Sequence, residues 1–281
     1  LHTIGFRGIG FKSTFSLGDQ VRLFTPTLST AFNRERFTEP VWIHKPNSFS
    51  HTAIQVTIKD EHRQAELEKN LSEWFQSSAS LLFFHNLRSL RICGQEVRWQ
   101  SLGVGPVPES EWMALASKPE EQYLLIRSAP EAFPPDALEE IRQERMVLSD
   151  DEAAFPPCRV EIVLGMEGRL FVVLPTGVST ALPFACNAPF IQDPARFKIK
   201  APGTSPTNRW LLARAGALAA EAMLTWVNNT DFSGEKRAQA YALLPDVDRK
   251  DNSLDGICAA FVEQAVEKTI KTTKFVMTEP N

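Results

Sequence analysis

Closely spaced glycines at the start of the chain limit what its first segment can form. Gly5, Gly8 and Gly10 stand in the string G-F-R-G-I-G-F-K-S, which continues into an apolar run. Glycine has no Cβ atom, so such a segment can take positive φ angles and bring its backbone close to a ligand. Free N–H groups at the mouth of a helix form a cradle for anions. The string therefore predicts a loop that enters a helix beside a charged ligand.

Two common phosphate-binding loops do not fit this string. The P-loop needs a glycine directly before its lysine, whereas Phe11 precedes Lys12. The dinucleotide-binding fingerprint follows a strand, and only residues 1–4 precede Gly5. Another class of nucleotide-binding loop has to be considered.

The pattern Gly8-Ile9-Gly10-Phe11-Lys12-Ser13, with Asp19 after it, resembles the second glycine box of the GHKL (Bergerat-fold) ATPases. It looks most like the sacsin-type branch, a group of modules similar to the ninety-kilodalton heat-shock chaperones. In that superfamily the loop is part of a lid over the ATP phosphates. The resemblance implies contacts with the nucleotide for Gly5, Gly8, Ile9, Gly10, Phe11, Lys12 and Ser13.

Two further segments are similar to the same family. His51-Thr52-Ala53-Ile54 lies where the family has a strand whose threonine reaches the adenine end, although a threonine in a strand is also ordinary structure. Leu182-Pro183-Phe184, with Asn187 and Phe190 behind it, resembles a sacsin-type motif that is followed by an arginine. The resemblance implies that Arg196 is the catalytic group reaching the γ-phosphate, since a guanidinium offers forked donors to phosphoryl oxygens. A plain surface arginine is the alternative, and Lys198 and Lys200 are neighbouring candidates.

Other parts of the family pattern are missing. The superfamily has a glutamate that activates water, an asparagine that holds Mg²⁺ and a D-x-G-x-G box that reads adenine. Asp255-Gly256-Ile257-Cys258 lacks the second glycine of that box. The resemblance implies ATP and Mg²⁺ as cofactors, with the metal ligand and the base expected upstream of Leu1. ATP hydrolysis is accordingly expected only with those upstream residues.

Composition excludes several classes of protein. The net charge of −4 gives no global electrostatic case for nucleic acid, and no apolar run approaches the roughly 18 residues of a membrane span. The scattered Cys93, Cys158, Cys186 and Cys258 form no C-x-x-C pair, so we expect buried, reduced thiols in a cytoplasmic protein rather than a zinc site.

Helical and strand-like segments alternate irregularly, which predicts an α+β fold. We expect residues 1–100 to be the C-terminal part of a Bergerat-type α/β sandwich ATPase domain. Residues 101–235 would be a β-rich middle domain with crossing helices, because Gly103 to Pro108 is rich in glycine and proline. Residues 236–281 would begin a helical extension.

The resemblance to the GHKL family implies an ATP-binding module that drives a conformational change within a larger protein, with self-association as a further expectation. Two alternatives stay open. One is a GHKL ATPase coupled to nucleic acid, as in MutL-like or antiviral defence assemblies. The other is a scaffold that keeps the fold without the chemistry.

Overall fold

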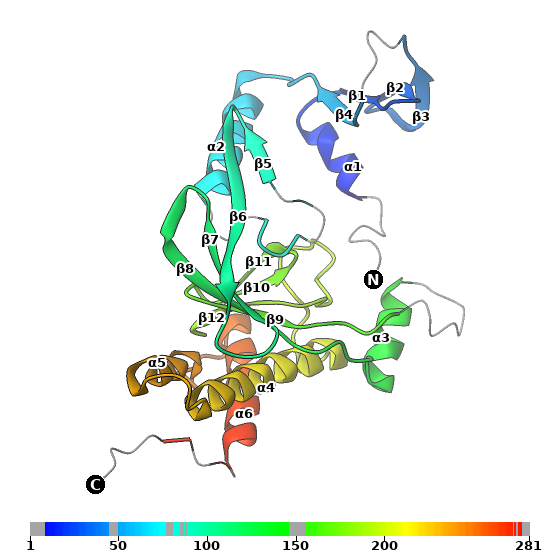
Figure 1. Cartoon of the computed structure of the whole chain (residues 1–281). Coiled ribbons are helices and arrows are strands. Elements are labelled where there is room, and N and C mark those ends of the chain that lie inside the picture. The colour runs from blue at the N-terminus through cyan, green and yellow to red at the C-terminus, as the bar shows by residue number, and fades with distance from the viewer. Residues whose placement is uncertain are drawn as a thin grey trace. The chain divides into compact units, whose positions relative to one another are not determined.

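The structure is a computed structural model that describes residues 9–44, 50–76, 81–84, 87, 89–145, 155–271, 273 and 275–276. The chain divides into two compact units, residues 2–77 and residues 78–281. Each unit mixes helices and strands, which confirms the α+β class (Figure 1). The units are described in turn.

The first unit is built on a four-stranded antiparallel sheet in the order β3-β2-β1-β4. Its elements are α1 (Ile9–Ser13), the 3-10 turn η1 (Thr14–Ser16), β1 (Gln20–Phe24), β2 (Ser29–Asn33), β3 (Arg36–Trp42), β4 (Ala53–Val56) and α2 (Glu61–Gln76). The aromatic ring of Phe11 packs on Phe32 of β2, with 4.8 Å between the ring centroids. Phe15 and Val21 are buried beside them. Burial of these apolar side chains holds α1 and η1 to the sheet.

The second unit contains an eight-stranded sheet in the order β11-β10-β12-β9-β8-β7-β6-β5. Its strands are β5 (Ser89–Ile92), β6 (Gln95–Val104), β7 (Ser110–Leu115), β8 (Lys118–Arg127), β9 (Glu161–Leu164), β10 (Arg169–Val172), β11 (Leu174–Ser179) and β12 (Phe184–Asn187). All neighbours are antiparallel except β10 and β12. Cys93 and Gly94, both with positive φ, turn β5 into β6 as the primed hairpin turns require.

One predicted strand pair is wrong. The sequence predicts a hairpin of residues 159–164 and 170–174 around Gly165 to Gly168, and both strands exist. However, β12 lies between β9 and β10 and pairs with both. Phe184, Ala185 and Cys186 of β12 are fully buried, so the third strand gains more apolar burial in the middle of the sheet than at its edge.

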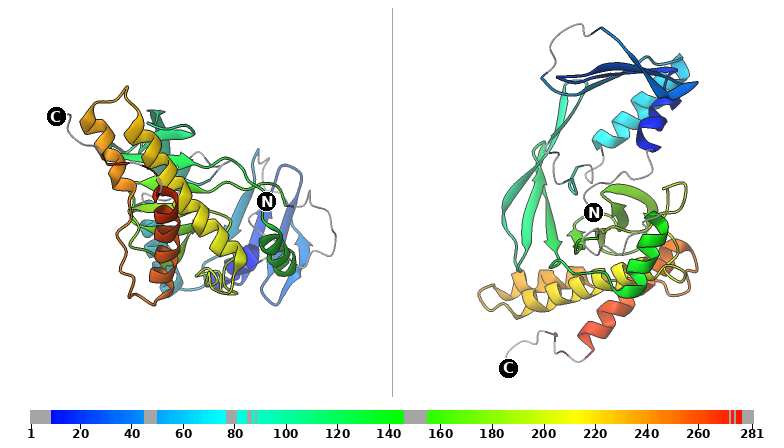
Figure 2. Two further views of the ribbon diagram at one scale, coloured as in Figure 1. Left: turned by 90° about the horizontal axis from the view of Figure 1, so that it is seen from below. Right: turned by 90° about the vertical axis from the view of Figure 1, so that its right-hand side faces the viewer.

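Helices cover one face of this sheet (Figure 2). They are α4 (Pro206–Asn228), the 3-10 turn η3 (Gln239–Leu243) and α6 (Leu254–Ile270). The helix α3 (Pro135–Arg145) packs on α4 instead, and α5 (Gly234–Ala238) has no buried residue. The main core joins strand residues such as Leu124 and Ile162 to Leu212 of α4 and Val262 of α6. A second, smaller core with Tyr123 lies on the other face. Successive residues of β8 therefore point to opposite faces of the sheet and belong to different cores.

The helices α4 and α6 cross closely at Gly216. A Cβ atom at this position would lie 2.7 Å from the Cβ atom of Ala265 and would also collide with the backbone of Val262. Because Gly216 leaves this space free, the two helix backbones can approach each other. Of these two helices, only α4 lies within residues 101–235, where we expected crossing helices, and α6 lies in the expected extension.

The units do not follow the domain limits that we expected from the sequence. The division falls at Ser77 and Ser78 rather than at residue 100, because β6 pairs with β5 and β7 across the expected limit. Residues after 235 are not a separate extension either, since Leu243 and Cys258 belong to the main core. The helix expected over residues 61–84 ends at Gln76.

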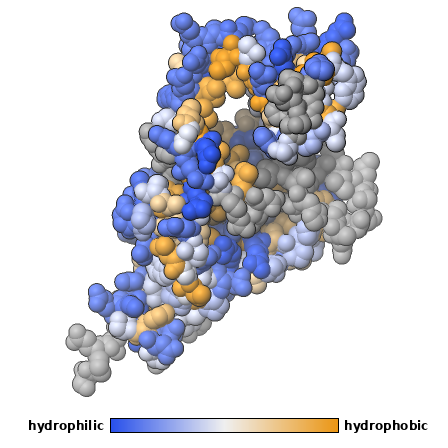
Figure 3. Space-filling model, turned by 45° about the horizontal axis from the view of Figure 1, so that its top comes forward, coloured by the Kyte–Doolittle hydropathy of each residue, from blue (hydrophilic) through white to orange (hydrophobic). Residues whose placement is uncertain are grey.

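Apolar residues reach the surface at several places on the face shown in Figure 3. Within the ranges that the structure describes, no helix has the length and the apolar character needed to cross a membrane.

Candidate functional site

The glycine string leads into α1, as the sequence predicts. Ile9, Gly10, Phe11, Lys12 and Ser13 form this short helix. The other two glycines of the string, at positions 5 and 8, lie outside the described residues. Lys12 and Ser13 are exposed, so the two polar side chains of the string are accessible to a ligand.

A pocket in the first unit contains the lysine of the string. It is lined by Lys12, Phe15, Ser16, Arg34 and Phe37. The Lys12 ammonium lies 4.5 Å from the centroid of the Phe37 ring, a distance at which a cation and an aromatic face attract each other. The pocket thus presents two cations and a hydroxyl group above aromatic walls, a set of groups suited to an anionic ligand.

Arg34 is the pocket residue that the sequence did not single out. It follows β2, and its guanidinium lies 3.4 Å from a carboxylate oxygen of Asp19. Lys59 contacts the other oxygen of the same carboxylate at 3.8 Å, which agrees with the local pairing expected of Asp19. All three side chains are more than half exposed, so these ion pairs are weak and leave Arg34 able to bind another anion. Only the pairing of β2 with β1 brings Arg34 near Lys12.

Thr52 does not line this pocket. It is exposed and directly precedes β4, whose first residue Ala53 pairs with Phe24 at the end of β1. The pocket lies at the other end of β1, where Gln20 pairs with Asn33, the neighbour of Arg34. Four residue steps along a strand correspond to about 13 Å. Thr52 and Lys12 could therefore meet only opposite ends of one extended ligand.

Arg196 belongs to the second unit and lies in a tight turn. Its φ angle of 56° is in the left-handed region, which a non-glycine residue adopts only when its surroundings hold it there. The Asp193 carboxylate accepts hydrogen bonds from the backbone N–H groups of Phe197 and Lys198, at 2.9 and 3.2 Å. The Gln192 amide donates to the Arg196 carbonyl at 3.1 Å. The turn is held by these contacts before any ligand arrives.

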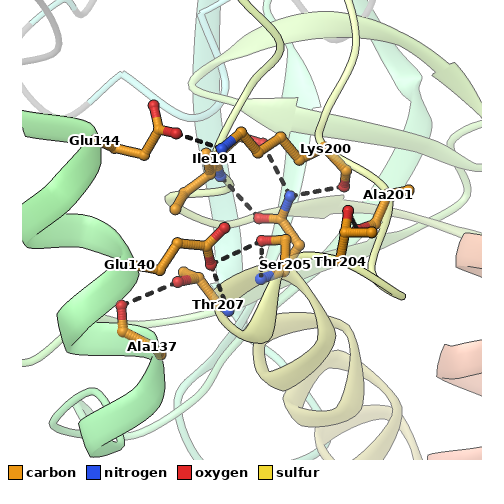
Figure 4. A network of polar contacts seen from close by, with 10 residues as sticks. Ala137, Glu140, Glu144, Ile191, Lys200, Ala201, Thr204, Ser205 and Thr207 are labelled. Carbon is orange, nitrogen blue, oxygen red and sulfur yellow. Dashed lines mark hydrogen bonds and ion pairs between the residues drawn. The ribbon is translucent and has the colours of Figure 1, made fainter.

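The two lysines near Arg196 differ in their surroundings. Lys198 is exposed. Lys200 forms an ion pair with Glu144 of α3 (Figure 4). Because that pair already engages the Lys200 ammonium, Lys200 is the weaker candidate for a phosphate ligand.

A buried asparagine at the start of α4 anchors this turn. Asn208 is fully buried, and its carbonyl oxygen accepts a hydrogen bond from the Ile191 N–H at 2.7 Å. Its amide donates to the carbonyl groups of Ile191 and Lys200, at 2.8 and 2.9 Å. One side chain therefore joins both ends of the segment that carries Arg196.

The N-terminus of α4 is capped twice. The Ser205 hydroxyl accepts a hydrogen bond from the Asn208 N–H at 3.2 Å and donates to the Glu140 carboxylate at 2.9 Å. The same carboxylate oxygen of Glu140 accepts from the Thr207 N–H at 3.0 Å. A carboxylate at a helix N-terminus also interacts favourably with the helix dipole. The acidic residues Glu140 and Glu144 of α3, expected to be solvated, thus tie α3 to α4 and to the segment before it.

Asn187, the asparagine of the sequence motif before Arg196, also has a structural role. Its amide donates to the buried Glu161 carboxylate at 2.7 Å, and its oxygen accepts from the Val173 N–H at 2.8 Å. Val173 has a positive φ of 62° between β10 and β11. Arg127 contacts the other Glu161 oxygen at 3.3 Å. Asn187 and Asn208 thus both stabilise irregular backbone in the second unit.

No three His, Cys, Asp or Glu side chains come together in a way that could hold a metal ion, among the residues that the structure describes. The four cysteines are free; Cys186 and Cys258 are buried, but Cys93 is exposed against our expectation. Burial raises the pKa of Cys258 to about 12, which keeps that thiol neutral near pH 7.

No known family model, curated protein or solved structure matches this chain.

Proposed function

We propose that the first unit binds the phosphate groups of ATP in the pocket around Lys12 and Arg34, as part of a GHKL-type module that drives a conformational change. The observation that carries the proposal is the meeting of the glycine-string lysine with a second cation in one pocket. A polyphosphate can accept charge-assisted hydrogen bonds from both neighbouring cations and a further hydrogen bond from the hydroxyl group. The resemblance of the string to a GHKL lid selects ATP among polyphosphates.

Mg²⁺ is a separate part of the proposal. The described carboxylates form no cluster suited to it, and the Asp19 carboxylate faces two cations. In this proposal Lys12 and Arg34 therefore bind the phosphates directly, by ion pairing. No step through a metal follows from these residues.

Equilibrium titration with ATP tests the proposal. Lys12→Gln and Arg34→Gln should each weaken ATP binding, by roughly tenfold or more, because each removes a charge-assisted hydrogen bond of about 1.5–3 kcal/mol. Arg36→Gln is the matched control. Arg36 is equally cationic and exposed, lies in the same hairpin and pairs with Glu39, but it does not line the pocket.

ATP affinity that is equal in the two pocket variants and in the wild type would refute the pocket. Equal losses in all three variants would indicate a general charge effect instead.

A further inference from the structure

A row of four uncharged residues crosses the sheet of the first unit and has exposed apolar side chains at its two ends. The register aligns Trp42, Thr30, Leu23 and Ile54 across β3, β2, β1 and β4. Directly opposed residues lie on the same face of a sheet. Trp42 is 73% exposed and Ile54 is 55% exposed, whereas Thr30 between Trp42 and Leu23 is buried. The exposed apolar side chains of the row are therefore those of Trp42 and Ile54, at its two ends.

The row and the pocket lie on the same face. Phe32 is two residues beyond Thr30 in β2, so its side chain points to the same side. The Phe11 ring packs on Phe32, which places α1, and with it Lys12, on that face. Two residue steps separate the rows of Thr30 and Phe32, or about 7 Å. The row therefore begins next to the part of the sheet that α1 covers.

Charge divides this face into two regions. Lys12 and Arg34 line the pocket, whereas the row from Trp42 to Ile54 contains no charged side chain. A matching ligand is anionic at one end and planar and apolar at the other. A nucleotide has this division between its phosphates and its base.

We propose that Trp42 binds the base of the nucleotide, by stacking of its indole ring on the base. The inference rests on the proposed phosphate pocket and assigns the remaining part of the ligand. Aromatic stacking tolerates every base, since each has a π face. Trp42 should therefore contribute affinity for nucleosides in general rather than a choice among bases.

The test compares ATP with inorganic tripolyphosphate, which has the phosphates without the base. Trp42→Ala should weaken ATP binding at least about fivefold, the lower end of what one aromatic–base stack contributes, and leave tripolyphosphate binding unchanged. Trp42→Phe should retain most of the ATP affinity, because a phenyl ring still stacks. The fluorescence difference between wild type and Trp42→Phe isolates the Trp42 signal, which ATP should quench and tripolyphosphate should not.

Val41→Ala provides the matched control. Val41 is 53% exposed in the same strand, and the alternation of side chains places it on the opposite face. Its substitution should change neither affinity.

The two proposals fail in different ways. Equal affinity of the wild type for ATP and tripolyphosphate, or unchanged ATP binding by Trp42→Ala, would overturn the base platform and leave the phosphate pocket standing. Loss of both ligands in Trp42→Ala would also overturn it, because the effect would not depend on the base. Binding of neither ligand by the wild type would overturn the phosphate pocket and the platform together.

Discussion

Replacement of Asn208 by alanine should destabilise the second unit strongly. The side chain is fully buried and makes three hydrogen bonds, one with the Ile191 N–H and two with the carbonyl groups of Ile191 and Lys200. Each such bond contributes about 1 kcal/mol net, and a buried group left without its partner costs about 1–3 kcal/mol. The Asn208→Ala variant should therefore lose about 3–5 kcal/mol of unfolding free energy, a large share of the about 5–15 kcal/mol typical of a domain.

Urea denaturation monitored by far-UV circular dichroism measures this loss. Asn228→Ala is the control, because Asn228 lies in the same helix, is exposed and donates one hydrogen bond to the Leu224 carbonyl. Surface substitutions of this kind stay within about 0.5 kcal/mol. A loss below about 1 kcal/mol in Asn208→Ala, or one no larger than in Asn228→Ala, would refute the anchoring role.

Limited proteolysis provides a second measurement on the same variant. Trypsin can cleave after Arg196 and Lys198, in the segment that Asn208 closes at both ends. Release of the anchor should raise the local opening of this segment and hence its cleavage rate. Equal cleavage of wild type and Asn208→Ala would show that Asp193 and its neighbours hold the turn without the asparagine.

Two further predictions concern Arg196 and the cysteines. On the hypothesis that the intact protein is a GHKL-type ATPase, Arg196→Ala should leave ATP binding nearly intact and reduce hydrolysis roughly a hundred- to thousand-fold, as for loss of one transition-state donor. A hydrolysis rate equal to that of the wild type would exclude Arg196 from the active site. Ellman's reagent at pH 8 should modify the exposed Cys93 first, since burial raises the pKa of Cys158 to about 11 and that of Cys258 to about 12 and only a thiolate reacts. These raised pKa values also predict that unfolding free energy decreases as pH rises from about 9 towards 11, because unfolding allows both thiols to ionise; a flat pH profile there, or equal reaction rates for the thiols, would contradict their burial.

Local signals in the sequence are enough to predict several helices and turns of this fold. The apolar spacing predicts helices over residues 208–227 and 253–273, close to the observed α4 and α6. In the structure, their N-caps Ser205 and Ser253 each accept a hydrogen bond from the third residue after them. Gly94 likewise marks the turn between β5 and β6. Such signals lie within a few residues of one another, so they can be read without knowledge of the rest of the fold.

Contacts between segments that are far apart in the sequence became visible only in the folded structure. No local pattern predicts β12 as a strand, and its place between β9 and β10 depends on how much apolar surface each arrangement buries. Arg34 reaches the pocket of Lys12 through the pairing of β1 and β2, and Trp42 joins Ile54 in one row through four strands. Contacts between residues far apart in the chain come from packing of the whole unit, and therefore no local pattern specifies them.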